Sequence, residues 1–300
     1  REAKHIIISE VEHPSVYNTA KALRKFGVEI TEVGVNNGGR VVPKDVAKSI
    51  KPETALVTVM TANNETGTIQ PIREISELCR KKNIRFHTDA VQALGKIPID
   101  VDNFAPHTAS FSAHKLYGPK GVGALYVGRG IKLHPLLHGG GQEQTLRAGT
   151  ENVAGIAGFG LACELAAEDL PSESQNLAAL RDQTIGHILH QLPNAVIHGD
   201  SEHFLPGVLS IGLSGIDAQS LLMRLDLDGF AVSTGAACSS GVAKPSRPLS
   251  AMGLNDDECK STLRISFGRF TQGPDVDAFL DSFTKHAKSM TKREKAEMPT

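Results

Sequence analysis

The chain has 300 residues and a formal net charge of −1, from 32 basic and 33 acidic side chains. This balance gives no electrostatic footprint for nucleic acid or an anionic membrane surface. Apolar residues make up 40% and charged residues 22%, and no apolar run approaches the ~20 residues that a membrane-spanning helix needs. We therefore expect an ordinary soluble globular protein, of a length that suits two domains.

The four cysteines lie far apart in the sequence, with no C-x-x-C pair and no His/Cys spacing typical of a metal site. This usage indicates a reducing compartment, which we take to be the cytoplasm, and no disulfide framework. Cys79, Cys163 and Cys259 fall in helical patterns and are expected to be small buried hydrophobes.

Strand and helix patterns alternate along the first half of the chain. We expect strands at residues 5–9, 28–35, 55–60 and 84–88, and helices at 14–26, 43–50 and 72–82. This alternation predicts an α/β fold whose mostly parallel sheet is covered on both faces. Ligands of such sheets lie beyond the carboxyl ends of the strands. The sequence places polar residues there, namely Glu12, His13, Asn63, Asn64, Glu65, Asp89, His114 and Lys115.

A polar, proline-bearing stretch at residues 170–174 follows a small-residue helical pattern at 151–168. We interpret this stretch as a boundary between a large domain at 1–170 and a smaller α+β domain at 171–300. The elements expected in the second domain are helices at 177–192, 217–227 and about 274–290, and strands near Ala195, near Val208 and at 263–267.

Lys115 lies in the segment SFSAHKLYGPKGVGALYV, between an expected strand and a glycine-rich turn. A lysine held in this way can be partly desolvated, which lowers its pKa and makes the amine available for a Schiff base. The alternative is an ordinary surface lysine, which is by far the commoner case.

Asp89 closes the expected strand IRFHTD. A carboxylate at the end of a buried strand needs a cationic partner. It could cap a backbone turn, or it could pair with a protonated heterocyclic nitrogen such as that of pyridoxal phosphate.

Several motifs together resemble the class V aminotransferase superfamily of pyridoxal phosphate enzymes. These are ANNETG, HTDAVQALGK, SFSAHK with YGPKGVGALYV, and RAGTEN, in the family's order. The nearest resemblance is to the cysteine desulfurase branch, which supplies sulfur for iron–sulfur cluster assembly, and it extends over about residues 4–288. It implies the aspartate aminotransferase-like fold, with a large domain built on a mostly parallel sheet of the seven-stranded type and a small C-terminal domain.

The resemblance also implies a role for each matching residue at the cofactor. Lys115 would form the Schiff base, Asp89 would pair with the pyridine nitrogen, and His13 would stack on the ring as a third catalytic-site residue beside Lys115 and a cysteine. Asn64 and Gln92 would hydrogen-bond the ring oxygen. From the residues alone, His13 could be purely structural, and Asn64 and Gln92 could be ordinary turn caps.

Three further residues would bind the phosphate of pyridoxal 5′-phosphate. Ser112 and His114 would contact it within the chain, and Thr150 would reach it across a homodimer interface. Thr150 could equally be the N-cap of the helix that follows, since its spacing does not separate the two roles.

Arg264, in TLRISFGRF, matches the family's arginine for the substrate carboxylate, beside which Asn64 would also contact the substrate. A planar guanidinium suits this task because it binds a carboxylate through two parallel hydrogen bonds. The alternative is an arginine at a domain interface that pairs with an acid.

Cys238 lies in AVSTGAACSSGVAKPSR, where small residues and glycines show no helical or strand period. We expect a mobile loop with an accessible thiol, because this composition offers little apolar packing. A thiolate that can swing is what sulfur transfer needs, and the resemblance places the catalytic cysteine here.

The sequence thus predicts a cysteine desulfurase that uses pyridoxal 5′-phosphate and converts L-cysteine to L-alanine, leaving a persulfide on Cys238. Its expected partners are a sulfur acceptor or iron–sulfur scaffold protein and a second copy of the chain, with no nucleic acid and no membrane. A selenocysteine lyase would keep the same site, whereas an ordinary transaminase has no use for a thiol on a mobile loop.

The chain begins at Arg1 without the glycine- and threonine-containing turn with which the family's large domain opens onto the cofactor phosphate. We expect a family member that lacks the N-terminal part of this domain, from which a targeting signal would also be missing. This feature favours a further alternative, a catalytically impaired homologue that acts only as a binding module.

Overall fold

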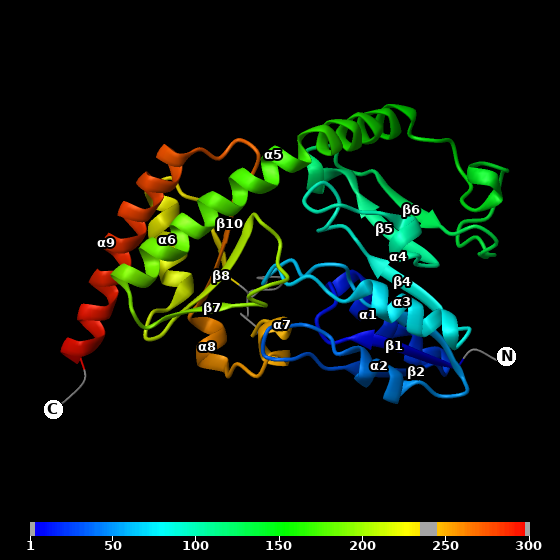
Figure 1. The fold of residues 1–300 in the computed structure, drawn as a ribbon, viewed down its shortest axis with the longest axis horizontal. Coiled ribbons are helices and arrows are strands. Elements are labelled where there is room, and N and C mark those ends of the chain that lie inside the picture. Colours follow the sequence, from blue (N-terminus) through cyan, green and yellow to red (C-terminus); the bar gives the residue numbers. More distant parts are fainter. Residues whose placement is uncertain (1–3, 235–244, 298–300) are drawn as a thin grey trace.

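The first half of the chain forms a six-stranded sheet with the strand order β2-β1-β3-β4-β5-β6 (Figure 1). The computed structural model describes residues 4–234 and 245–297. All neighbouring strands pair in parallel except β5 and β6, so the predicted mostly parallel α/β sheet is confirmed, with six strands. The strands are β1 (His5–Ser9), β2 (Glu29–Val33), β3 (Thr54–Thr58), β4 (Arg85–Asp89), β5 (Thr108–Ser112) and β6 (Gly123–Val127).

The helices of this half include the three that the sequence pattern predicts, and one short helix at residues 101–104 that it does not. They are α1 (Pro14–Leu23), α2 (Pro43–Ser49), α3 (Ile72–Lys81) and α4 (Val101–Phe104), with short 3₁₀ turns η1 (Arg24–Phe26) and η2 (Ala113–Leu116). In α3 the buried residues Ile72, Ile75 and Cys79 recur at helical spacing and pack against the sheet with Phe86 of β4. Burial of this stripe fixes α3 on the sheet.

A single helix, α5 (Val153–Gln191), runs from the first sheet to the second. The sequence pattern predicts separate helices at 151–168 and 177–192, but α5 continues through Pro171. A proline inside a helix removes one backbone hydrogen bond. Both halves of α5 are nevertheless packed, since Phe159 and Ala166 join the core beside η2, and Leu180 and Ile188 join the core of the second sheet. The predicted domain boundary at residue 170 therefore lies inside a helix and stays a prediction.

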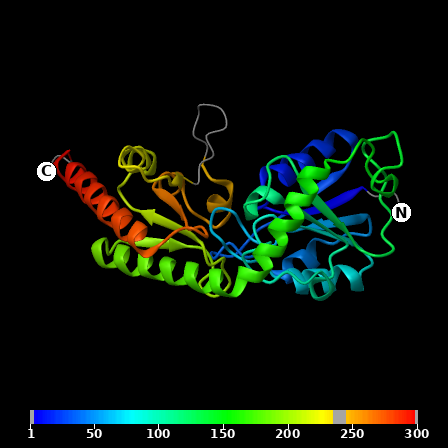
Figure 2. The same cartoon turned by 90° about the horizontal axis from the view of Figure 1, so that it is seen from above.

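The second half of the chain forms a four-stranded antiparallel sheet with the order β7-β8-β10-β9. Its strands are β7 (Ala195–His198), β8 (Val208–Leu213), β9 (Ser233–Thr234) and β10 (Thr262–Ser266). The C-terminal half of α5 packs on it together with α6 (Ala218–Leu227) and α9 (Gly273–Glu297), as the two views in Figures 1 and 2 show. The short helix α7 (Arg247–Ala251) lies toward the first sheet, α8 (Asp256–Lys260) contacts β8, and η3 (Glu143–Thr145) precedes α5.

Among the described residues, no helix is both long enough and apolar enough to cross a membrane. Cys79 and Cys259 are buried and Cys163 is half-buried, and all three are free thiols, in agreement with their expected place in helices.

Candidate active site

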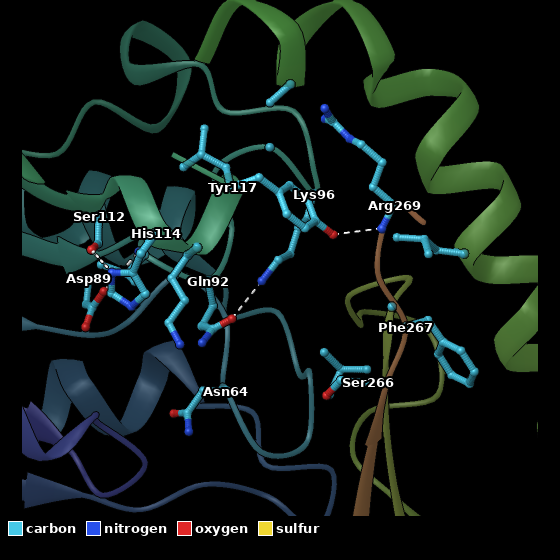
Figure 3. Close-up of a pocket in the computed structure, with 18 of the residues that line it drawn as sticks. Asn64, Asp89, Gln92, Lys96, Ser112, His114, Tyr117, Ser266, Phe267 and Arg269 are labelled. Carbon is cyan, nitrogen blue, oxygen red and sulfur yellow. Dashed lines mark hydrogen bonds between the residues drawn. The ribbon is translucent and has the colours of Figure 1, made fainter. Parts of the chain in front are cut away.

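A cavity of about 530 Å³ opens where the two sheets and α5 meet (Figure 3). The first sheet contributes residues that follow its parallel strands, as expected for the carboxyl edge of such a sheet. Arg264, Ser266 and Phe267 enter from β10 and the residues after it, while Ala166 and Glu173 come from α5. The cavity collects these predicted site residues: His13, Asn64, Asp89, Gln92, Ser112, His114, Lys115 and Arg264.

Asp89 ends β4 and is only 7% exposed. Its Oδ1 accepts a hydrogen bond of 3.0 Å from the backbone N–H of Val91, so it does cap the turn that follows the strand. It also lines the cavity, and no ion pair to it exists within the described part of the chain. A buried carboxylate in this state suits a cationic ligand group.

His13 is the N-cap of α1, so it does have the structural role that its sequence position allows. Its Nδ1 accepts from the backbone N–H of Ser15 at 3.2 Å and lies 2.8 Å from the Ser15 hydroxyl. The ring is exposed and lines the cavity. Capping fixes the ring at the cavity wall, so the two roles are compatible.

Asn64 and Arg264 meet across the cavity from opposite halves of the chain. The Nη1 of Arg264 donates to the backbone carbonyl of Asn64 at 2.9 Å, and the Nε of Arg264 is buried without a hydrogen-bond partner. Burial lowers the pKa of Arg264, and the nearby charge of Glu65 opposes this shift. Turn capping belongs to the neighbouring Asn63, whose Oδ1 accepts from the backbone N–H groups of Glu65 and Thr66, so the side chain of Asn64 is left to the cavity.

Ser112 and His114 form a pair at the end of β5, with the Ser112 hydroxyl 2.8 Å from the His114 Nδ1 (Figure 3). Lys115 follows in η2, and its side chain is exposed at the cavity. The expectation of a desolvated Lys115 is therefore wrong for this structure. The reason is that η2 presents residues 114 and 115 outward and buries Ala113 and Leu116 against α5 instead.

Lys96 is a cavity residue that the sequence pattern does not indicate. It is half-buried, and its Nζ donates to Gln92 Oε1 at 2.8 Å. Burial, together with the nearby charges of Lys115 and Arg264, lowers its pKa to about 8, although Glu173 acts in the opposite direction. The available signal was its place four residues after Gln92, a spacing that brings side chains together in a helical turn.

The far wall of the cavity is also built from residues that the sequence did not indicate. Tyr117 OH accepts from the backbone N–H of Arg269 at 2.7 Å, and the Arg269 guanidinium pairs with Glu173 at 2.8 Å. These contacts join η2, the segment after β10 and α5.

One predicted residue of the described chain does not line the cavity. Thr150 is exposed, and the N-cap of α5 is Asn152, so the alternative of Thr150 as a plain N-cap is wrong. Cys238 lies outside the described residues. The residues that follow its segment are anchored to the first half of the chain, because the Ser246 hydroxyl donates to the Glu65 carboxylate and Arg247 donates to backbone carbonyls of Glu10 and Glu12.

Comparison with known proteins identifies the class to which this fold and site belong. The profile of the family described as Aminotransferase class-V matches residues 1–279, and the chain belongs to this family. Its members use pyridoxal 5′-phosphate, and the fold expected from the sequence is confirmed.

Within the family, the similar proteins carry more particular names. A protein of Dictyoglomus turgidum named cysteine desulfurase IscS is 44% identical over 280 residues, which cover 93% of this chain and 71% of that protein. The structure of a NifS-like protein superposes with a TM-score of 0.89 at 35% identity, covering 96% of this chain and 76% of that one. The structure titled SspA in complex with cysteine has a TM-score of 0.75 at 34% identity, and the match covers 91% of this chain and 76% of that one.

The cavity residues fit the cofactor of this family. Asp89 offers a buried carboxylate without an ion pair in the described chain, and Arg264 offers a buried guanidinium nitrogen without an acceptor. A cationic ring nitrogen and the carboxylate of an amino acid would satisfy these two groups.

Proposed function

We propose that this chain removes sulfur from L-cysteine, with pyridoxal 5′-phosphate as cofactor, to give L-alanine and a persulfide on Cys238. The observation that carries the proposal is the convergence of Lys115, Asp89 and Arg264 on one cavity from both halves of the chain. A cysteine desulfurase at 44% identity supports the reaction, and the family supports the cofactor.

The roles of the residues follow from their chemistry and placement. Asp89 would hold the ring nitrogen of the cofactor, and His13 would lie on its ring. Ser112 and His114 would bind its phosphate. When bound, the cofactor supplies an electron sink for negative charge at the α-carbon of the substrate. Asn64 and Gln92 would hold its ring oxygen.

Arg264 would bind the carboxylate of L-cysteine through its guanidinium, with Asn64 beside it. The amine of Lys115 would remove the proton from the α-carbon and return a proton to the product carbon. The thiolate of Cys238 would form a bond to the substrate sulfur as the bond between that sulfur and Cβ breaks, so that alanine leaves and Cys238 keeps a persulfide.

Replacement of Cys238 by alanine separates binding from sulfur transfer. We expect Cys238→Ala to lose alanine and sulfide formation from L-cysteine while it binds pyridoxal phosphate as the unchanged chain does. Cys163→Ala is the matched control, because this half-buried cysteine does not line the cavity, and it should keep full turnover. Retained desulfuration by Cys238→Ala would overturn the proposal. A faster reaction on selenocysteine would favour the lyase, and no turnover by the unchanged chain would favour a binding module.

The partners and the compartment are part of the same proposal. We infer a homodimer in the cytoplasm that passes sulfur to an acceptor or scaffold protein, with Thr150 directed to the cavity of the second copy. Exposed apolar side chains in the segment before α5 and at its first residue support an interface, since Leu136 is 91% exposed and Val153 is 71% exposed. Light scattering should give twice the chain mass, and a single chain mass would contradict the dimer.

A further inference from the structure

Lys96 is a second lysine in the cavity that holds Lys115, and it has no part in the proposed reaction. It lies in the turn that follows β4, between Gln92 and the segment after β10 (Figure 3). Three features define it: a fixed backbone, a fixed side-chain partner and a cationic environment.

The backbone of Lys96 is held on one side by its own turn and on the other by α5. Its N–H donates to the carbonyl of Ala93 at 3.0 Å, and its carbonyl accepts from the Ser174 hydroxyl at 3.0 Å. The preceding Gly95 has a φ of +72°, and a Cβ there would lie 3.1 Å from the Cβ of Ala166. The turn therefore approaches α5 so closely that residue 95 has to be glycine. This fixed backbone determines the position from which the Lys96 side chain extends.

The side chain of Lys96 determines how Gln92 is oriented. An ammonium group can only donate hydrogen bonds, so the Gln92 atom that lies 2.8 Å from Nζ must be the amide oxygen. The Gln92 amide nitrogen is then the end left free to donate. Figure 3 shows this nitrogen on the side of Gln92 away from Lys96, toward Asn64 and Asp89.

The charges that face Lys96 are mostly of its own sign. Lys115 of η2 and Arg264 of β10 are the cations that act on it, and Glu173 of α5 is the acid. Glu173 is engaged by Arg269 at 2.8 Å, and within the described residues Lys96 forms no ion pair. A half-buried ammonium without a counterion favours an anion in the cavity.

We propose that Lys96 is a positioning residue for the ring oxygen of the cofactor: it turns the amide nitrogen of Gln92 toward that oxygen and adds positive charge that stabilises the oxygen as an anion. This inference rests on the proposed function for the identity of the cofactor, for the contact of Gln92 with its ring oxygen and for its attachment to Lys115. It does not depend on which amino acid is the substrate or on Cys238.

The proposal predicts two changes when Lys96 is replaced by methionine. Gln92 loses the partner that fixes its amide, so the affinity for pyridoxal phosphate falls by about tenfold. Loss of a nearby positive charge favours the protonated form of the nitrogen that links Lys115 to the cofactor. The pH at which the visible absorption of the bound cofactor changes therefore rises by about one unit.

The experiment is a pyridoxal phosphate titration of the purified chain, followed by a pH titration of the visible absorption spectrum. Lys96→Gln retains a donor for Gln92 but no charge, so it should shift the transition pH while it largely keeps the affinity. Lys96→Arg retains both and should resemble the unchanged chain. Lys81→Met is the matched control, because Lys81 is exposed on α3 and does not line the cavity.

A Lys96→Met protein with an unchanged transition pH would overturn the proposal, whatever its affinity. If Lys96→Met does not fold, as judged by the Tm of its cofactor-free form, the transition pH of Lys96→Gln is measured instead. An unchanged transition pH in Lys96→Gln would then overturn the proposal. A shifted transition together with absent desulfuration would contradict the proposed reaction but support the role of Lys96. An unchanged chain that binds no cofactor would overturn both.

Discussion

Glu12 is the most deeply buried carboxylate beside the candidate site, at 1% exposure. Its Oε1 accepts from the Ser9 hydroxyl and from the backbone N–H of Met60, both at 2.7 Å, while Oε2 is buried without a partner. Burial raises the pKa of Glu12 to about 7, although these hydrogen bonds and Arg247 lower it. The residue therefore changes charge near neutral pH, next to His13.

The raised pKa predicts a specific effect of pH on stability. Between the ordinary value of 4.5 and about 7, the folded chain keeps a proton on Glu12 that the unfolded chain has released. The resulting stability is complete below 4.5 and is lost as the pH rises through 7. Glu12→Gln cannot ionise, so its free energy of unfolding should exceed that of the unchanged chain by about 1–3 kcal/mol at pH 8 and match it near pH 4.

Urea denaturation at the two pH values measures this difference. Glu53→Gln is the control, since Glu53 is exposed and its replacement should show no such pH dependence. If the free energies of unfolding of Glu12→Gln and of the unchanged chain differ by the same amount at both pH values, ionisation of Glu12 is not the cause of the pH dependence.

The residues of the candidate site were predictable to the extent that they follow strands. Asp89 ends a strand that the apolar pattern predicts, and the cavity does contain it. Lys96 and Tyr117 were missed because they reach the cavity through turn geometry, and Tyr117 has a left-handed φ of 64° that the sequence pattern does not reveal. The exposure of Lys115 depends on which face of η2 packs against α5, which is equally a tertiary effect.

At the scale of elements, α7 fastens the second half of the chain to the loop that carries His13. The Nη1 of Arg247, at the start of α7, donates to the carbonyl of Glu10 at 2.8 Å, and its Nη2 donates to the carbonyl of Glu12. Its guanidinium carbon lies 3.5 Å from the centroid of the Tyr17 ring. One side chain thus ties α7 to both the β1–α1 loop and α1.

Loss of Arg247 should loosen this attachment. Arg247→Ala removes the donors to two carbonyls and the contact with Tyr17, so we expect a loss of about 2–3 kcal/mol in the free energy of unfolding. Arg247→Lys keeps the charge without the paired donors and should recover only part of this loss. Thermal or urea denaturation of both variants tests the expectation, and an unaltered stability of Arg247→Ala would contradict it.

The elements themselves were predicted well where one face is strongly apolar. The strand at residues 5–9 and the helix at 72–82 correspond to β1 and α3 within one residue, because their patterns match the periods of a buried strand and an amphipathic helix. The sequence pattern separates the helices expected at 151–168 and 177–192, whereas α5 joins them, because Pro171 and its polar neighbours indicate an interruption only locally. The packing of both ends of α5 outweighs the lost hydrogen bond, and such packing cannot be inferred from a short window of sequence.

At the scale of the whole molecule, the cavity exists only where the two sheets meet. Asp89 and Lys115 come from the first sheet, Arg264 comes from the second, and α5 runs beside both (Figure 1). A ligand that contacts all three residues therefore connects parts of the chain that are far apart in sequence. Because it would bind the folded chain and not the unfolded one, the cofactor should stabilise the molecule by mass action.

The central claim is that this cavity holds pyridoxal phosphate on Lys115. The most direct test is borohydride reduction of the chain with added cofactor, followed by peptide mapping of the modified lysine by mass spectrometry. We predict a single pyridoxyl group on Lys115, and its disappearance in Lys115→Ala. A group on Lys96, the other lysine of the cavity, or no modified lysine at all, would contradict the account.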